Sequence, residues 1–341
     1  MPATTEVSPP LANLETHEHV MAAAMLQKAG ELAVNAVVNP EAHTEEVRSL
    51  NQEQYDMLVE NFGKDPKESL AWARESLLAI ASDERLTPQE REEHLDSHLD
   101  AYLSLTLKLD HDAFPPTKDG EVGEGVVDYV PDGFSDMGRQ KSLDPSKRDR
   151  EMLHVDKKAL FDLYRPTLKA LFSKDYSGLS SEQKKKAMMS FLAKSVYFDL
   201  LRTNGEAAKN MGGGTVELAN VSEGVCRHQA LAFQVLAQAA GLKTGIIKSD
   251  AQFGDRNPEP HSSNIVRVDG KWFLLDVTNP DGVDLENENG ERVWKPGIIP
   301  IDAPPSKTGI TTYEGETPVG HQHRKYIVHN RAFWTITEAA A

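Results

Sequence analysis

Apolar residues recur at helical spacing in two parts of the chain, separated by a stretch that lacks long periodicity. In the first part the pattern predicts four helices, at 18–38, 44–62, 66–81 and 88–109. The fourth is expected to begin after Thr87, because Thr87-Pro88-Gln89-Glu90 supplies an N-cap, a first-turn proline and an early acid. In the second part, helices are predicted at 152–172 and 180–201.

The stretch between these parts, residues 113–150, is rich in Gly, Asp and Pro, which predicts a linker or covering loop. Its apolar residues are too numerous for a free linker and are expected to dock on a neighbouring domain: Val126, Val127, Tyr129, Val130 and Phe134. One hypothesis is that this stretch lies across the functional site and limits access to it.

After Gly241 the pattern changes from helix to strand. An Ala-rich helix precedes this glycine, with Ser222 as its expected N-cap and Gly241 at its C-terminal end. Asp269-Gly270 predicts a two-residue hairpin turn in which Val268 pairs with Lys271. Strands are predicted at 243–249, 261–268 and 271–277, with a polar loop over 251–260.

The last 60 or so residues are expected to complete the sheet. A hairpin is predicted around Asn289-Gly290, followed by a Pro-rich covering loop over 296–318 and closing strands over 326–336.

Charge and cysteine content narrow the class of partner. The net charge is −16, and residues 1–112 carry most of it, with 22 acidic and 8 basic side chains. Nucleic acid and anionic membranes require a basic face, so neither is an expected partner. One cysteine and the absence of an apolar leader indicate a cytoplasmic protein, or one exported without a cleaved signal peptide. His94 and His98 lie four residues apart on one helical face but have no adjacent third ligand at a known spacing. His321, His323 and His329 are interpreted as polar positions on the surface and on strands, so no metal and no cofactor is predicted.

The single cysteine, Cys226, stands at the start of the Ala-rich helix. The helix dipole and the N–H groups of the first turn favour a thiolate there and can stabilise an oxyanion on an attacked carbonyl. Extending the hairpin register puts Asp276 opposite Ser263, diagonal to His261 on the same face. This arrangement predicts Cys226 as nucleophile, His261 as base and Asp276 as the carboxylate that orients it. The alternative is that Cys226 is a small buried hydrophobic residue.

These residues resemble the motifs of the transglutaminase-like superfamily of papain-type cysteine enzymes. Gly224-Val225-Cys226-Arg227 resembles the nucleophile motif, and His261 and Trp272–Asp276 resemble the His and Asp motifs, over roughly residues 185–280. The resemblance implies an α+β core, in which the cysteine helix packs on an antiparallel sheet, within a catalytic domain at 151–341. The helical spacing and the acidic charge of the first third of the chain separately predict an acidic helical bundle at 1–112. The resemblance also implies an upstream residue that helps bind the oxyanion, for which Tyr197 is the candidate; the alternative is that Tyr197 is a core residue of its helix.

Two functions are consistent with the sequence. The first is an enzyme that attacks a peptide or glutamine carboxamide carbonyl of a protein or peptide substrate through a Cys226 thioester, which is released to water or to an amine. Release to water is favoured because water is always present. The second is a catalytically silent module of the same fold that binds protein partners.

Overall fold

The structure is a computed structural model, and it divides into two compact units, Met1–Leu105 and Thr106–Ala341, which are described separately. The residues that it describes are 66–113, 126–127, 129–136, 152–202, 214–284, 293–305, 309–316 and 323–329.

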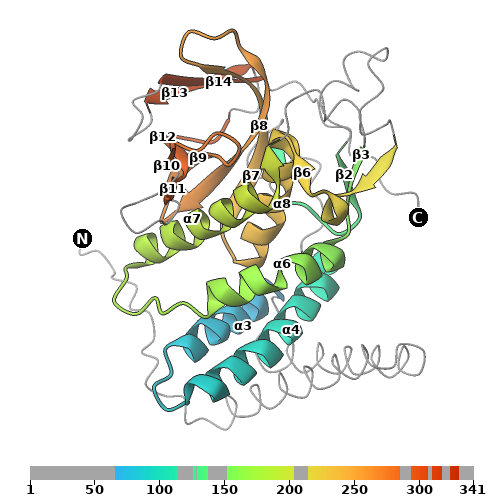
Figure 1. Cartoon of the computed structure of the whole chain (residues 1–341), viewed down its shortest axis with the longest axis vertical. Coiled ribbons are helices and arrows are strands. Elements are labelled where there is room, and N and C mark those ends of the chain that lie inside the picture. The colour runs from blue at the N-terminus through green and yellow to red at the C-terminus, as the bar shows by residue number, and fades with distance from the viewer. Residues whose placement is uncertain are drawn as a thin grey trace, which may run out of the picture. The chain divides into compact units, whose positions relative to one another are not determined.

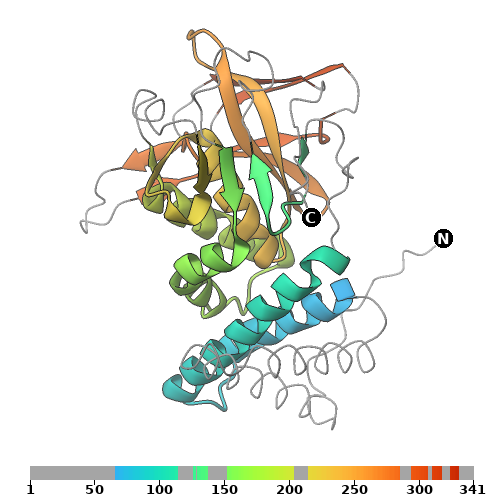
Figure 2. The same cartoon turned by 90° about the vertical axis from the view of Figure 1, so that its right-hand side faces the viewer.

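The first unit contains α3 (Pro66–Ala81), and α4 (Pro88–Ala113) begins in it. Both helices are predicted by their apolar spacing, and α4 ends four residues later than expected. Thr87 and Glu90 cap α4 reciprocally, since the Glu90 N–H donates to Thr87 Oγ1 at 3.2 Å and the Thr87 N–H donates to Glu90 Oε2 at 2.8 Å. Figures 1 and 2 both show the two helices side by side. The helices expected at 18–38 and 44–62 lie outside the described residues.

The second unit is built on an antiparallel sheet in the order β12-β9-β8-β7-β14-β13, with β1 also paired to β7. Its longest strands are β7 and β8, the orange pair in Figures 1 and 2. Asp269 and Gly270, with φ of 46° and 84°, close the turn from β8 to β9. The predicted register is confirmed, since Val268 pairs with Lys271. The strands are β1 (Val126–Val127), β7 (Lys243–Phe253), β8 (Glu259–Val268), β9 (Lys271–Asp276), β12 (Gly297–Ile301), β13 (Ile310–Glu316) and β14 (His323–His329).

The two faces of this sheet are covered differently. One face packs against α8 (Cys226–Ala239), where the Asn264 side chain donates to the Ala230 carbonyl at 3.1 Å. The other face carries an apolar core that includes Ile265 and Leu274. Because side chains alternate along a strand, His261 and Asp276 belong to this second face.

Helices α6 (Lys157–Phe172) and α7 (Ser181–Asp199) pack against α8, as Figure 1 shows. The predicted Ser180–Gln183 capping box opens α7. Gly241, with φ of 73°, follows α8 as expected. The described part of the unit also contains three smaller sheets: β2 (Phe134–Asp136) with β3 (Met152–Val155) and β5 (Thr215–Glu217), β4 (Leu201–Arg202) with β6 (Glu223–Gly224), and β10 (Gly282–Asp284) with β11 (Val293–Lys295).

The prediction of a helix from residue 152 is wrong at its start. Residues Met152–Val155 form β3, and Asp156 caps α6 by accepting from the Ala159 N–H at 2.8 Å. A side-chain cap fixes the first helical residue, so the apolar residues before Asp156 belong to a strand instead. The polar loop predicted at 251–260 is also shorter, because β7 continues to Phe253 and β8 begins at Glu259.

The covering loop predicted at 296–318 contains two strands, β12 and β13. Pro300 lies within β12, which is an edge strand of the sheet. An edge strand tolerates proline because one side needs no N–H donor, so the prolines misled the prediction. A hairpin does occur near the predicted one, as β10 and β11, but its register differs, because Asp284 pairs with Val293 and a two-residue turn at Asn289-Gly290 would pair it with Lys295. The residues between the two strands lie outside the described residues.

The stretch 113–150 also contains strands that the sequence pattern did not predict, β1 and β2. Val130 and Phe134 are buried, as expected for apolar residues that dock rather than move freely. No helix in the described part of the chain is both long and apolar enough to cross a bilayer.

Candidate active site

Cys226 is the first residue of α8, and its side chain is partly exposed. The N-cap is Val225 and not Ser222 as predicted, because the chain reaches the helix as an extended β6 segment. The His228 side chain takes the place of a capping carboxylate, accepting from the Val225 N–H through Nδ1 at 3.1 Å. Starting the helix at Cys226 puts its sulfur where the helix dipole favours a thiolate.

Gly224 allows β6 to approach this first turn closely. A Cβ atom at residue 224 would lie 2.7 Å from His228 Cβ, which is closer than side-chain atoms can pack. The glycine therefore makes room for the side chain that caps α8.

His261 lies on β8 where the sheet narrows. The strand remains paired with β7 as far as Glu259 but pairs with β9 only from Asn264 onward. His261 Nε2 lies 2.9 Å from Asp276 Oδ2, so Nδ1 is the ring nitrogen left for its hydrogen bond with Cys226. The structure thus brings the three predicted residues, Cys226, His261 and Asp276, into one continuous hydrogen-bonded row.

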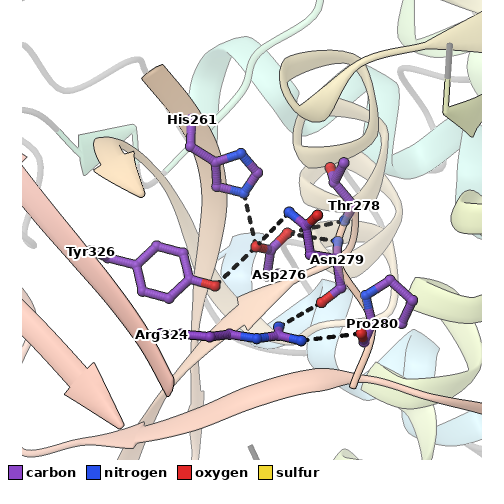
Figure 3. Close-up of polar contacts among 7 residues, drawn as sticks. All are labelled: His261, Asp276, Thr278, Asn279, Pro280, Arg324 and Tyr326. Atoms are coloured by element: carbon purple, nitrogen blue, oxygen red, sulfur yellow. Dashed lines mark hydrogen bonds and ion pairs between the residues drawn. The ribbon is translucent and has the colours of Figure 1, made fainter. Parts of the chain in front are cut away.

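Asp276 ends β9 and is fully buried. Its Oδ1 accepts from the backbone N–H groups of Thr278 and Asn279, each at 3.1 Å. Its Oδ2 accepts from the Asn279 side chain at 3.1 Å and from the Tyr326 hydroxyl at 2.9 Å, in addition to His261 (Figure 3). A carboxylate held by this many donors keeps its charge and a fixed orientation.

Arg324 secures the turn that supplies these donors. Its guanidinium donates to the carbonyls of Asn279 at 2.5 Å and Pro280 at 3.1 Å, as Figure 3 shows. Gly297 packs directly over this contact, and a Cβ there would collide with Arg324 Nη1 and the Asn279 carbonyl. Arg324 and Tyr326 come from β14, whose pairing with β7 has no signal in the sequence, and sequence reasoning missed both. Asn279 could have been suggested by the Asn-Pro turn after the strand.

The pKa values of the three groups follow from burial and from one another. Burial raises the pKa of Cys226, but the charge and hydrogen bond of His261 and the N–H of Ser262 lower it to about 7. Burial lowers the pKa of His261, yet Asp276 and Cys226 raise it to about 10. Burial raises the pKa of Asp276, and His261 outweighs this effect to give about 2. Between about pH 7 and pH 10 the favoured state is therefore thiolate, imidazolium and carboxylate.

Tyr197, the candidate oxyanion donor, lies on α7 with its ring against Phe198 and Trp294, at centroid distances of 5.2 and 6.0 Å. Trp294 and Phe198 also line a shallow pocket of about 570 Å³ on α7, which contains neither Cys226 nor His261. The role of Tyr197 stays a prediction.

Within the described residues, no group of three or more His, Cys, Asp or Glu side chains is placed to hold a metal ion. His94 and His98, which are four residues apart on α4, contact each other locally: His98 Nδ1 lies 2.7 Å from the His94 carbonyl oxygen.

Comparison with protein families supports a coarse class. A family model described as EDR1/CTR1/ARMC3, peptidase-like, matches residues 147–283, a range that contains Cys226, His261 and Asp276. No curated protein matches the chain. The fold is α+β, and the matched part of the chain is similar to a peptidase-like domain.

Proposed function

We propose that the protein is a thiol acyl-transfer enzyme of transglutaminase-like type, acting on a peptide or glutamine carboxamide carbonyl. The observation that carries this proposal is the position of His261, which is hydrogen-bonded to Asp276 on one side and to Cys226 on the other. The description of the matching family as peptidase-like supports a hydrolase more than a purely structural role.

The first half-reaction forms a thioester. The Cys226 thiolate attacks the carbonyl carbon, and the oxyanion that develops is stabilised by N–H groups of the first turn of α8. Tyr197 is proposed as a further donor. The imidazolium of His261 then gives its Nδ1 proton to the nitrogen that leaves, and the C–N bond breaks. The products are an acyl-enzyme and either ammonia or an amine.

The second half-reaction releases the acyl group. Neutral His261 takes a proton from water or from an amine, which attacks the thioester, and the Cys226 thiolate leaves. Water gives hydrolysis or deamidation, whereas an amine gives a cross-link. Hydrolysis is the proposed outcome, since water needs no binding site of its own. Asp276 remains ionised throughout and keeps the His261 ring oriented.

The test is mass spectrometry of candidate proteins incubated with the enzyme and a primary-amine probe. Chain cleavage, loss of ammonia and amine incorporation each give a distinct mass change, so the same experiment identifies the acceptor. Cys226→Ala is expected to abolish every one of these changes while leaving the fold intact. A Cys226→Ala variant that retains full activity would contradict the proposal.

The second candidate is a silent module that binds protein partners. The observation that favours it is the pocket on α7, whose lining includes none of Cys226, His261 and Asp276 and combines aromatic residues with Lys174 and Lys194. Under this alternative, the substrate proteins would bind to the chain without any mass change, and Cys226→Ala would leave their binding unaltered.

A further inference from the structure

A buried ion pair lies beside the candidate nucleophile and has no part in the proposed reaction. Lys248 Nζ is 3.0 Å from Asp136 Oδ2, and the two side chains are only 6% and 3% exposed. Removing two charges from water costs several kcal/mol per ion, which their attraction offsets only in part. Such a pair therefore contributes little to stability, and its buried position beside Cys226 indicates a different role.

The pair connects the elements that carry the nucleophile and the base. Lys248 on β7 lies directly opposite Ser262 on β8, the residue after His261. The backbone N–H of Ser262 is hydrogen-bonded to the Cys226 sulfur. Asp136 is the last residue of β2, and its backbone carbonyl accepts from the guanidinium of Arg227 at 3.4 Å. Arg227 directly follows Cys226 in the chain.

We propose that Lys248 and Asp136 are positioning residues that set the charge balance at Cys226, Lys248 favouring the thiolate and Asp136 limiting that effect. This inference rests on the proposed function, since it assumes that the thiolate is the working form of Cys226. It also gives the described end of the 113–150 stretch a role, because Asp136 comes from that stretch. The stretch then acts on the site through charge.

The electrostatic surroundings of the sulfur support this assignment. Burial raises the pKa of Cys226, and the charges that lower it are those of His261 first and Lys248 after it. The buried charged or titratable groups on the surrounding elements include Arg227 and His228 on α8, His261 on β8, Lys248 on β7, Asp276 on β9, Arg324 on β14 and Asp136 on β2. Asp136 is directly paired with the lysine that acts on the sulfur, so neutralising either partner changes the field at Cys226.

Neutralising the two partners should move the thiol in opposite directions. Lys248→Met removes a positive charge and is expected to raise the pKa of Cys226 by about one unit. Asp136→Asn leaves Lys248 to interact with the thiolate and is expected to lower the pKa of Cys226 by a smaller amount, because Asp136 acts on the sulfur through Lys248. A purely structural ion pair predicts something else: breaking it from either side loosens the site and shifts the thiol in the same direction.

The experiment measures the rate of iodoacetamide alkylation of the full chain against pH. At a fixed pH below 7, Lys248→Met should react about tenfold more slowly than wild type and Asp136→Asn several-fold faster. Lys158 and Asp162 provide a matched control, because they form an exposed Lys–Asp pair at 2.6 Å on α6. Lys158→Met and Asp162→Asn should leave the alkylation profile unchanged.

The double variant Lys248→Met/Asp136→Asn keeps the test valid if a single variant fails to fold, since it buries no unpaired charge. The pKa of its thiol should lie between the values of the two single variants. It should also lie slightly above the wild-type value, which is the comparison to make if the single variants do not fold. Shifts in the same direction, or no shift, would overturn the inference. Because the measurement needs no substrate, it also separates the two proposals. A wild-type thiol with the ordinary cysteine pKa of about 8.5 would count against the proposed function and not against the role of the ion pair.

Discussion

Removing the Tyr326 hydroxyl isolates one of the contacts that hold Asp276. Tyr326 is fully buried, and its hydroxyl donates to Asp276 Oδ2 at 2.9 Å. Burial and the nearby Asp276 raise the pKa of Tyr326 well above its usual value, so it donates as a neutral hydroxyl. A hydrogen bond to a charged group contributes about 1.5–3 kcal/mol, and Tyr326→Phe should lower the free energy of unfolding by that amount.

Tyr313→Phe is the matched control for this substitution. Tyr313 is the cross-strand neighbour of Tyr326, and its hydroxyl donates at the same distance, 2.9 Å, to the neutral carbonyl of Ala303. Its loss should cost only about 0.5–1.5 kcal/mol. The assay is urea denaturation followed by circular dichroism, with the three proteins compared at equal m-values. If Tyr326→Phe costs no more than Tyr313→Phe, the hydroxyl does not stabilise a buried carboxylate.

Three further predictions test the surroundings of the site. Gly224→Ala should lower the free energy of unfolding by about 1–3 kcal/mol, because the added Cβ would overlap His228. A urea midpoint equal to that of wild type would exclude the close packing. Asp269→Val should lower the free energy of unfolding by about 1–2 kcal/mol and Asp269→Asn by much less, because φ at residue 269 is positive. Equal urea midpoints for these two variants would count against the turn geometry. The pKa of Asp276 is lowered to about 2, so its stabilisation is complete above pH 3.8 and is lost as the pH falls through 2. As the pH is lowered through this range, the free energy of unfolding of wild type should therefore fall by about 2 kcal/mol more than that of Asp276→Asn. Identical profiles of stability against pH for the two proteins would contradict this.

Local sequence patterns were sufficient where a short-range signal fixes the geometry. The Asp269-Gly270 turn admits one tight hairpin register, which is why the diagonal relation of His261 and Asp276 could be predicted. The helices α3 and α7 were likewise predictable, because amphipathic spacing and a capping box act within one turn of chain.

Contacts between distant parts of the chain could not be predicted in this way. Arg324 and Tyr326 reach Asp276 only because β14 pairs with β7 at a register that the sequence does not encode locally. Asp136 and Lys248 are 112 residues apart, and each reads in isolation as an ordinary surface charge. The N-cap of α8 was misplaced because the N-cap is Val225, whose side chain cannot accept a hydrogen bond, and because His228 stands where a capping box usually carries Glu or Gln.

The most direct test of the thiol mechanism is the pH dependence of the Cys226 thiolate, followed by its ultraviolet absorbance in wild type and in His261→Gln. Wild type should titrate at about pH 7. His261→Gln should titrate at or above about 8.5, because burial then acts without an imidazolium to oppose it. A wild-type thiol that titrates near 8.5, or a His261→Gln variant that titrates like wild type, would contradict activation of Cys226 by His261.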